Sequence, residues 1–390
     1  MWRFLGNDSV ALSALIEPIQ ETARPILWQS RERVALIAHD WSMLSFGTHA
    51  SKTDRFQRTH KSDVGYELVT ALLIEADQGT PLGPMEIRLR TAQGVVTTRP
   101  GGAKAHAAHL DELIDVMDAS RAWRLDRPLV HIIDREADSV WHYRCWQAAG
   151  HQFVVRADDQ RRVRRQGVEQ SLPAVAQALL TEGAFVNIGK TIDYKGTVGR
   201  LLVAETTIVL DRPAQRKVAG KKKLIPGEPI ALRLVVCRVV DAEDPDKELA
   251  KWLLLTNVST WYDAATVVQW YYWRWRIESY YKLLKSAGQQ VEEWEQESGE
   301  AIARRLVIAS MACLTVWALR RDPSPAAGQL RRVLIRLSGR QMKFKVESTA
   351  PALLAGLEKL LAMLDLLGQY DIAELRRLVH DRLPFLFNSS

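Results

Sequence analysis

Two short apolar runs place the tightest limit on what this chain can fold into. Residues 34–38 read VALIA and residues 128–133 read PLVHII. Runs of this kind are typical of strands buried on both faces, which occur where helices cover a parallel sheet. Further strands are predicted at 64–75 and 84–91, and helices at 105–121 and 139–149. The sequence therefore predicts an α/β core.

The chain changes in character on either side of this core. A short helix is predicted at 10–22, ending before Pro25. Alternating β-type segments follow the core at 153–156, 201–209, 230–240 and 252–255, and two basic loops, RRVRR at 161–165 and RKVAGKKK at 216–223, interrupt them. Helices are predicted after Asn257, at 263–286, 299–320, 328–338, 350–367 and 371–382.

These segments predict five regions along the chain. We expect an N-terminal helical segment at 1–30, the first part of the core at 31–150, a β-rich insertion at 151–257, the second part of the core at 258–322 and a helical region at 323–390. The apolar stripe of LLAGLEKLLAMLDLLG, within the last region, suits either a core helix or pairing with a second copy of the chain.

Composition narrows the class of protein. The net charge of +7 comes with clustered cations, which favours an anionic partner. The three cysteines form no CxxC pattern and indicate reduced thiols in a cytosolic protein. The longest apolar run, at 306–319, is shorter than the roughly 20 residues that span a bilayer. We expect a soluble protein without a disulfide framework.

Two acids follow the buried-strand runs. Asp40 comes shortly after 34–38, and Asp134 directly follows 128–133. The carboxyl edge of an open α/β sheet is where ligands bind, so both side chains are candidates for a site there. The alternative, for either residue alone, is a turn position or the N-cap of a helix.

A third acid lies among cations and aromatic residues in WYYWRWRIESYYKLLKSAG, residues 270–288. On a continuous helix, five residues of this stretch fall within about an 80° arc. This stripe consists of Tyr271, Arg274, Glu278, Lys282 and Lys285. Ion pairs between residues four apart on a solvated helix are the alternative explanation.

Together these motifs resemble a known family. DREAD at 134–138, followed by the pattern Y-x2-R-x3-E-x6-K of Tyr271, Arg274, Glu278 and Lys285, is similar to the DDE transposases of the bacterial IS4 family. FVVR at 153–156, WLLLT at 252–256 and RWRIE at 274–278 continue the likeness in the same order. It covers residues 34–320, about three quarters of the chain.

The resemblance implies an RNase H-like catalytic core of the retroviral integrase type. Asp40, Asp134 and Glu278 would form its catalytic triad and hold Mg²⁺, as two ions with Mn²⁺ able to substitute. Hard oxygen ligands suit Mg²⁺, and two such ions activate the nucleophile and stabilise the leaving oxygen in phosphodiester cleavage. The expected reaction is cleavage at transposon ends and strand transfer into target DNA.

The resemblance also implies contacts with double-stranded DNA, at the transposon ends and in the target. Tyr271, Arg274 and Lys285 would bind phosphates, and Lys282 shares their stripe. Trp252 would stack on a flipped base and Arg156 would lie beside it; the alternatives are a core tryptophan and a surface arginine. A homodimer would hold the two ends together, in a bacterial cytoplasm and associated with the nucleoid.

One departure from the family concerns the N-terminus. Its members carry a helical DNA-binding domain before the first catalytic strand, whereas only 39 residues precede Asp40 here. We expect either a truncated chain or another means of recognising DNA ends. Two alternative functions therefore stay open: a non-catalytic regulator that forms inactive complexes with full-length transposase, and an RNase H-like nuclease unrelated to transposition.

Overall fold

The structure, a computed structural model, describes residues 2–7, 9–57, 60, 63–101, 104–218, 221–343 and 346–382. The chain forms two compact units. The first comprises Met1–Tyr281 and Glu292–Ile308, and the second comprises Lys282–Val291 and Ala309–Ser390.

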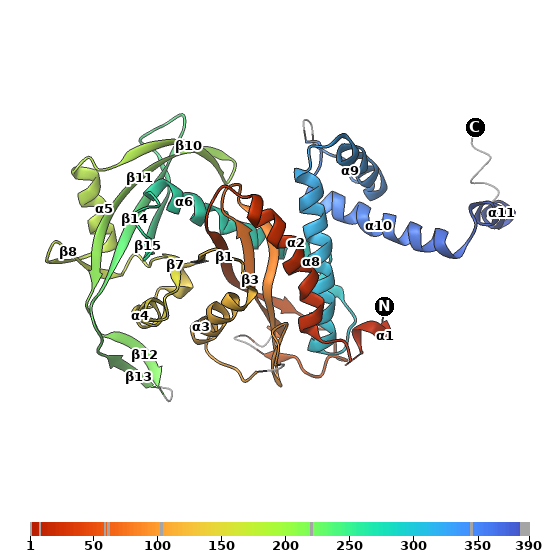
Figure 1. Cartoon of the computed structure of the whole chain (residues 1–390), viewed down its shortest axis with the longest axis horizontal. Coiled ribbons are helices and arrows are strands. Elements are labelled where there is room, and N and C mark those ends of the chain that lie inside the picture. Colours follow the sequence, from red (N-terminus) through yellow and green to blue (C-terminus); the bar gives the residue numbers. More distant parts are fainter. Residues whose placement is uncertain are drawn as a thin grey trace. The chain divides into compact units, whose positions relative to one another are not determined.

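A mixed sheet of 13 strands forms the centre of the first unit (Figure 1). Across the sheet its main path runs β5 (Gly94–Thr97), β4 (Thr80–Thr91), β3 (Val64–Glu75), β1 (Ala35–Ser45), β6 (Leu129–Ile133), β7 (Gln152–Arg156), β15 (Glu248–Thr256), β14 (Ile230–Asp241), β11 (Thr197–Leu210), β8 (Arg162–Arg165) and β9 (Val168–Ser171). Strand β2 (Phe56–Gln57) pairs with β3, and β10 (Val186–Tyr194) pairs with β11. Strands β1, β6 and β7 are parallel, and the other pairings are antiparallel.

Helices cover both faces of this sheet. The helical elements from the N-terminus to Arg321 are α1 (Trp2–Leu5), α2 (Leu12–Gln29), α3 (His109–Ser120), η1 (Arg121–Trp123), η2 (Arg135–Ala137), α4 (Val140–Ala148), α5 (Leu172–Thr181), α6 (Ala264–Trp273), α7 (Trp275–Leu284), η3 (Val291–Glu293) and α8 (Gly299–Arg321). Side chains of α3, α4 and α5 share one apolar core with Leu253 and Leu255 of β15. Because side chains alternate along a strand, Trp252 and Leu254 face the other side, where Trp252 meets α6. The expected α/β class is confirmed.

Helix α2 is longer than the sequence predicts. It continues to Gln29 with Pro18 and Pro25 inside it, so the predicted end before Pro25 is wrong. The helix buries one stripe that spans both prolines and packs against β4, formed by Ile16, Ile19, Ala23 and Leu27. Burial of this stripe outweighs the backbone hydrogen bond that each proline removes.

Strand β1 is also longer than predicted, and this changes the position of Asp40. The strand runs to Ser45, and Asp40 pairs with Thr70 of β3 in its middle. On the other edge of β1 the pairing with β6 ends at Ala38 and Ile132. Asp40 therefore does not end its strand, but it lies just beyond the point where the parallel neighbour ends.

The β-rich region continues the same sheet. Strand β7 pairs with β6 on one side and with β15 on the other, so it joins the core strands to the later ones. The first basic segment, predicted as a loop, is largely strand β8, because it pairs with β9 and β11. The second is the hairpin of β12 (Ala214–Val218) and β13 (Lys221–Ile225); its residues 219–220 lie outside the described part of the chain.

The helix predicted at 263–286 is two helices that meet at Arg274. The N–H of Arg274 donates to the carbonyl of Tyr271, and the N–H of Ile277 donates to the carbonyl of Arg274. This tighter spacing is typical of a 3₁₀ turn. The residues predicted to form one stripe, from Tyr271 to Lys285, therefore do not lie on a single unbroken helix, and Arg274 at the junction is buried.

The second unit is helical, as predicted. Helices α9 (Pro325–Ser338) and α10 (Ala350–Gln369) pack against each other, and α11 (Ile372–Arg382) follows. The second half of α10 exposes large apolar side chains, those of Leu361, Met363, Leu364, Leu366 and Leu367.

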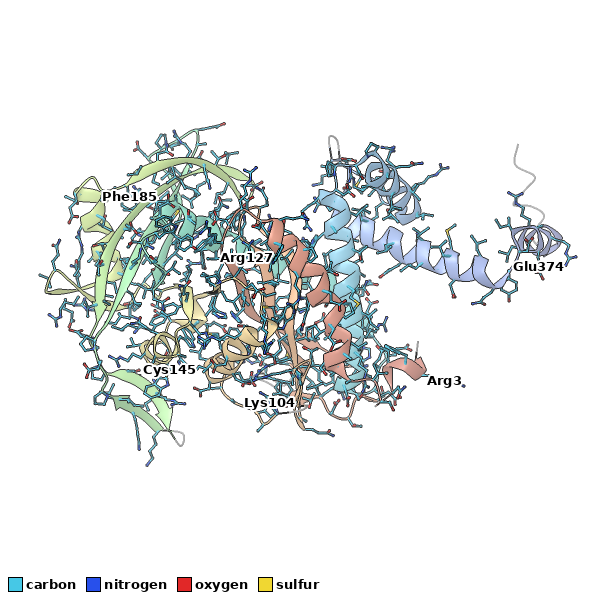
Figure 2. The ribbon with its side chains drawn as sticks, viewed as in Figure 1. Arg3, Lys104, Arg127, Cys145, Phe185 and Glu374 are labelled. Atoms are coloured by element: carbon cyan, nitrogen blue, oxygen red, sulfur yellow. The ribbon has the colours of Figure 1, made fainter. Side chains whose placement is uncertain are left out.

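Helix α8 alone, among the described residues, is long and apolar enough to cross a membrane, and 56% of its apolar window is buried in the protein. Core helices of soluble proteins have the same properties. Arg304 within it is buried and donates to the Leu5 carbonyl. The three cysteines are free thiols; Figure 2 labels Cys145, on α4.

Two glycines of α10 give a matched test of the packing in the second unit. A Cβ on Gly356 would lie 2.0 Å from the carbonyl oxygen of Leu334 in α9, whereas a Cβ on Gly368 would meet nothing within 4 Å. We expect Gly356→Ala to lower the free energy of unfolding of this unit by about 1–3 kcal/mol. Gly368→Ala should leave it unchanged or raise it by about 0.5–1 kcal/mol. Hydrogen exchange of the α10 amides in urea measures both, and equal effects would contradict the close approach.

Candidate active site

Asp40 of β1 is held by its neighbours in the strand and by α7. Its Oδ1 accepts a hydrogen bond of 2.9 Å from the N–H of Trp41, and its carbonyl oxygen accepts one of 2.7 Å from the Tyr281 hydroxyl. The side chain is 25% exposed. The carboxylate is thus fixed in direction while one oxygen stays open to other partners.

Asp134 directly follows β6. Continuing the register of β1 and β6 by two residues beyond Ala38 and Ile132 places Asp134 beside Asp40. Its Oδ1 accepts a hydrogen bond of 2.9 Å from the N–H of Glu136, so it is also the N-cap of η2. The Asp134 side chain therefore caps η2 and also lies beside Asp40. It is 39% exposed.

Glu278 of α7 contacts the same arginine, Arg274, as Asp40 and Asp134. The guanidinium of Arg274 lies 2.6 Å from Glu278 Oε1, 3.4 Å from Asp40 Oδ2 and 3.9 Å from Asp134 Oδ2. The Arg274 side chain is only 7% exposed, whereas that of Glu278 is 34% exposed. The structure thus brings all three predicted acids to one buried cation.

Burial and charge set the protonation of this cluster. Burial is the largest cause that raises the pKa of Asp40, and the negative charges of Asp134 and Glu278 raise it further; Arg274 and the Trp41 N–H offset part of this, leaving a pKa of about 6. Burial acts to lower the pKa of Arg274, but the negative charges around it outweigh burial and raise it. Arg274 stays charged while Asp40 titrates in a mild pH range.

Three other predicted residues form a group beside Arg274. Tyr271 of α6 lies with its ring centroid 5.7 Å from that of Trp252. Burial raises the pKa of the Tyr271 hydroxyl, and the nearby Arg274 and Arg156 act to lower it. Arg156 and Trp252 lie on neighbouring strands and on the same face of the sheet. Trp252 is only 8% exposed, so most of its ring is already covered in this structure.

Lys282 and Lys285 belong to the second unit. Lys282 lies in the last turn of α7 and is exposed, and Lys285 follows the end of that helix. Tyr281, whose hydroxyl donates a hydrogen bond to the carbonyl oxygen of Asp40, was not predicted from the sequence. Its spacing of three residues from Glu278 was a usable signal, because residues three apart lie on neighbouring positions of a helix.

The three carboxylates do not form a ready-made metal site. Within the described part of the chain, no group of three or more His, Cys, Asp or Glu side chains is close enough to hold one. The three carboxylates instead share the guanidinium of Arg274. Their chemistry still fits Mg²⁺, because all three supply hard, partly exposed oxygens and repel one another. A divalent cation would relieve that repulsion.

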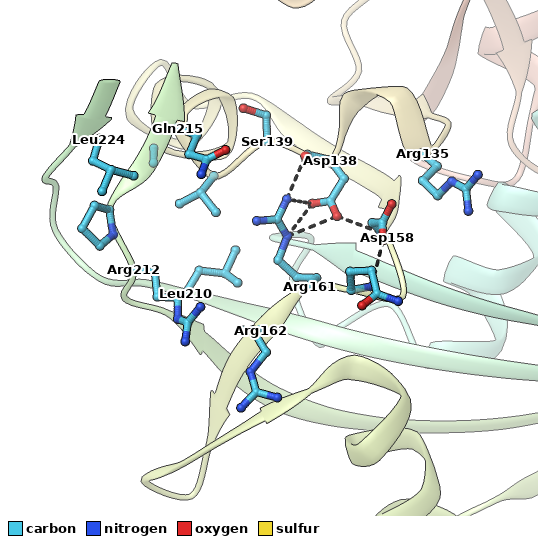
Figure 3. A pocket seen from close by; sticks show the side chains of 14 residues that line it. Arg135, Asp138, Ser139, Asp158, Arg161, Arg162, Leu210, Arg212, Gln215 and Leu224 are labelled. Carbon is cyan, nitrogen blue, oxygen red and sulfur yellow. Dashed lines mark hydrogen bonds and ion pairs between the residues drawn. The ribbon is translucent and has the colours of Figure 1, made fainter. Parts of the chain in front are cut away.

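A cavity of about 770 Å³ is lined by Arg135, the residue that follows Asp134, and by segments farther along the chain (Figure 3). It begins at Arg135 and extends along Asp138 to strand β8 and the β12–β13 hairpin. Asp138 pairs there with Arg161, at 2.9 Å, which ties the segment after η2 to the start of β8. The segment that follows Asp134 therefore lines an open space that also carries several arginines.

Comparisons with known proteins were negative. No family model matches the chain, and no curated protein sequence matches it. The resemblance to the transposase family thus rests on the short motifs alone, and the geometry of the site has to support any function by itself.

The raised pKa of Asp40 predicts a pH-dependent stability. Between about pH 4 and pH 6 the folded state binds the proton more tightly than the unfolded state, so the free energy of unfolding falls as the pH rises through this window. Asp40→Asn removes the effect. We expect the stability of this variant relative to the wild type to increase from pH 4 to pH 6 by up to about 2 kcal/mol and then level off. Urea unfolding at several pH values measures the difference, and a constant difference would contradict the burial of this carboxylate.

Proposed function

We propose that this protein is a DDE transposase of the IS4 type, a metal-dependent enzyme that cuts DNA at transposon ends and transfers the strand into target DNA. One observation carries the proposal: three carboxylates from β1, from the end of β6 and from α7 meet at the guanidinium of Arg274. The separation of these acids in the sequence makes a chance meeting less plausible than a common role.

The arrangement of strands supports an RNase H-like core for this enzyme. Strands β1, β3 and β4 follow one another as antiparallel neighbours, and β6 and β7 extend the sheet from the free edge of β1 in parallel. This order and these directions are those expected of an RNase H-like fold. The β-rich insertion lies between Asp134 and Glu278, where the family resemblance requires it.

In the proposed reaction the residues of this chain bind and orient. Asp40, Asp134 and Glu278 would hold Mg²⁺, with Mn²⁺ able to replace it. Bound there, the metal supplies Lewis-acid activation of the attacking oxygen and charge stabilisation at the leaving oxygen. Arg274 balances the charge of the carboxylates, and Tyr271, Arg156 and Trp252 form the adjoining surface for the strand end. Fixing that strand in line with the acids is itself a large part of catalysis.

The proposed partners are double-stranded DNA and a second copy of the chain. The net charge of +7, with Lys282 and Lys285 near the end of α7, favours an anionic polymer. The exposed apolar side chains in the second half of α10 support pairing through the C-terminal region. Such an enzyme would act in the bacterial cytoplasm, associated with the nucleoid.

Cleavage of the DNA that flanks the coding region tests the proposed function. With Mg²⁺ and a plasmid carrying both flanks, we expect cuts at matching inverted repeats, and Asp134→Asn or Glu278→Gln should lower the rate by more than about 100-fold. Substituting a residue that only supports a metal ligand typically lowers metal affinity or activity about 10–100-fold. These two substitutions remove a proposed ligand itself, so we expect a larger loss.

Glu136→Gln provides the matched control for this experiment. Glu136 is an exposed acid two residues from Asp134 that does not contribute to the Arg274 cluster, so its substitution should leave cleavage unchanged. Cleavage that survives Glu278→Gln would remove Glu278 from the mechanism. A wild-type protein that binds these ends, lacks cleavage and inhibits a full-length transposase would favour the regulator instead.

A further inference from the structure

The cavity beside Asp134 has features that the triad does not explain. Four separate segments line it: residues 135–140, residues 158–162, the turn from β11 into β12, and Leu224 of β13. All of them belong to the first unit. The cavity volume, about 770 Å³, lies within the range of roughly 300–1,000 Å³ that is usual for sites of small organic molecules.

Three arginines bring positive charge to this cavity. Arg135, Arg162 and Arg212 line it with exposed side chains, as Figure 3 shows. The Arg135 side chain makes no hydrogen bond or ion pair with any other described residue, whereas the side chains of Arg162 and Arg212 share the single carboxylate of Glu169. These arginines therefore retain donors for an anionic ligand.

The two acids in the lining are already engaged. Asp138 accepts hydrogen bonds from Arg161 and from the Asp158 N–H, and Asp158 accepts one from the Gln160 N–H. Their charges are thus directed at protein partners. The three exposed arginines outnumber these two acids in the lining.

Part of the lining is apolar. Leu224, on the hairpin, is 65% exposed although it is a large apolar residue, and Pro213 and Val140 lie in the same lining. Proteins that hold single-stranded nucleic acid track its phosphates with cations, and this lining combines such cations with apolar surface that a base or sugar can contact. Duplex DNA is too wide for a cavity of this size, but a few nucleotides of one strand are not.

We propose that this cavity holds an unpaired DNA segment that continues from the strand at the acids. The inference rests on the proposed function, because Arg135 directly follows Asp134 and so joins the cavity to the triad. In this arrangement Arg135 and Arg212 bind phosphates, and Leu224 contacts a base or sugar. The enzyme therefore prefers DNA that carries a single-stranded tail next to the cleavage point.

Binding measurements with two DNA forms test this inference. Fluorescence anisotropy compares a duplex that carries a single-stranded tail with a blunt duplex of the same sequence, in EDTA so that no cleavage occurs. Arg135→Ala combined with Arg212→Ala should weaken binding of the tailed DNA about tenfold and lower the salt slope by about 1.4, since each phosphate contact to a single strand contributes about 0.7. Binding of the blunt duplex should stay unchanged.

Two further variants keep the test specific. Arg31→Ala combined with Arg33→Ala removes the same charge from exposed positions before β1 and should change neither affinity. Leu224→Glu places a negative charge in the apolar part of the lining and should weaken binding of the tailed DNA but not of the blunt duplex. Circular dichroism checks that each variant is folded.

The outcomes separate this inference from the proposed function. The inference is overturned if Arg135→Ala combined with Arg212→Ala lowers the affinity for both DNA forms equally, or leaves the affinity for the tailed form unchanged. If cleavage depends on Asp134 and Glu278 while the tail has no effect, the proposed function stands and the inference fails. If the wild type lacks cleavage but its tail preference depends on Arg135 and Arg212, the cavity stands as a strand-binding site and the proposed function fails.

Discussion

The charge balance around Arg274 governs the arrangement of the site. A guanidinium this deeply buried has to be compensated, and Asp40, Asp134 and Glu278 supply that compensation from three elements. The same contact offsets part of the repulsion between these three partly buried carboxylates. Without the cation, the acids would separate or bind protons; without the acids, the cation would be buried unpaired.

The sheet makes this contact possible through register and length. Parallel pairing of β1 with β6 sets Asp40 beside Asp134, and the early end of that pairing opens the edge on which both project. Pairing with β3 holds β1 extended beyond this point, so that Asp40 stays in line. The break between α6 and α7 then brings Arg274 inward and leaves Glu278 one helical turn further along.

The later strands extend the surface that begins at the acids. Because β7 pairs with both β6 and β15, the residues of the insertion are fixed relative to the triad through continuous hydrogen bonding. Arg156, Trp252 and Tyr271 lie on the face that α6 covers. The segment after Asp134 instead lines the cavity that contains several arginines. Two different surfaces therefore adjoin the elements that carry the acids.

The sequence alone determined which segments become buried strands, that the C-terminal part is helical, and which three acids to consider, since these follow from apolar periodicity and local composition. Tertiary structure decided the rest. Pairing with β3 extended β1 past Asp40, burial of its apolar stripe carried α2 through Pro25, and strand pairing turned the first basic loop into β8. The break at Arg274 and the cavity beside Asp134 likewise depend on contacts between residues far apart in the chain, whose energies no local pattern contains.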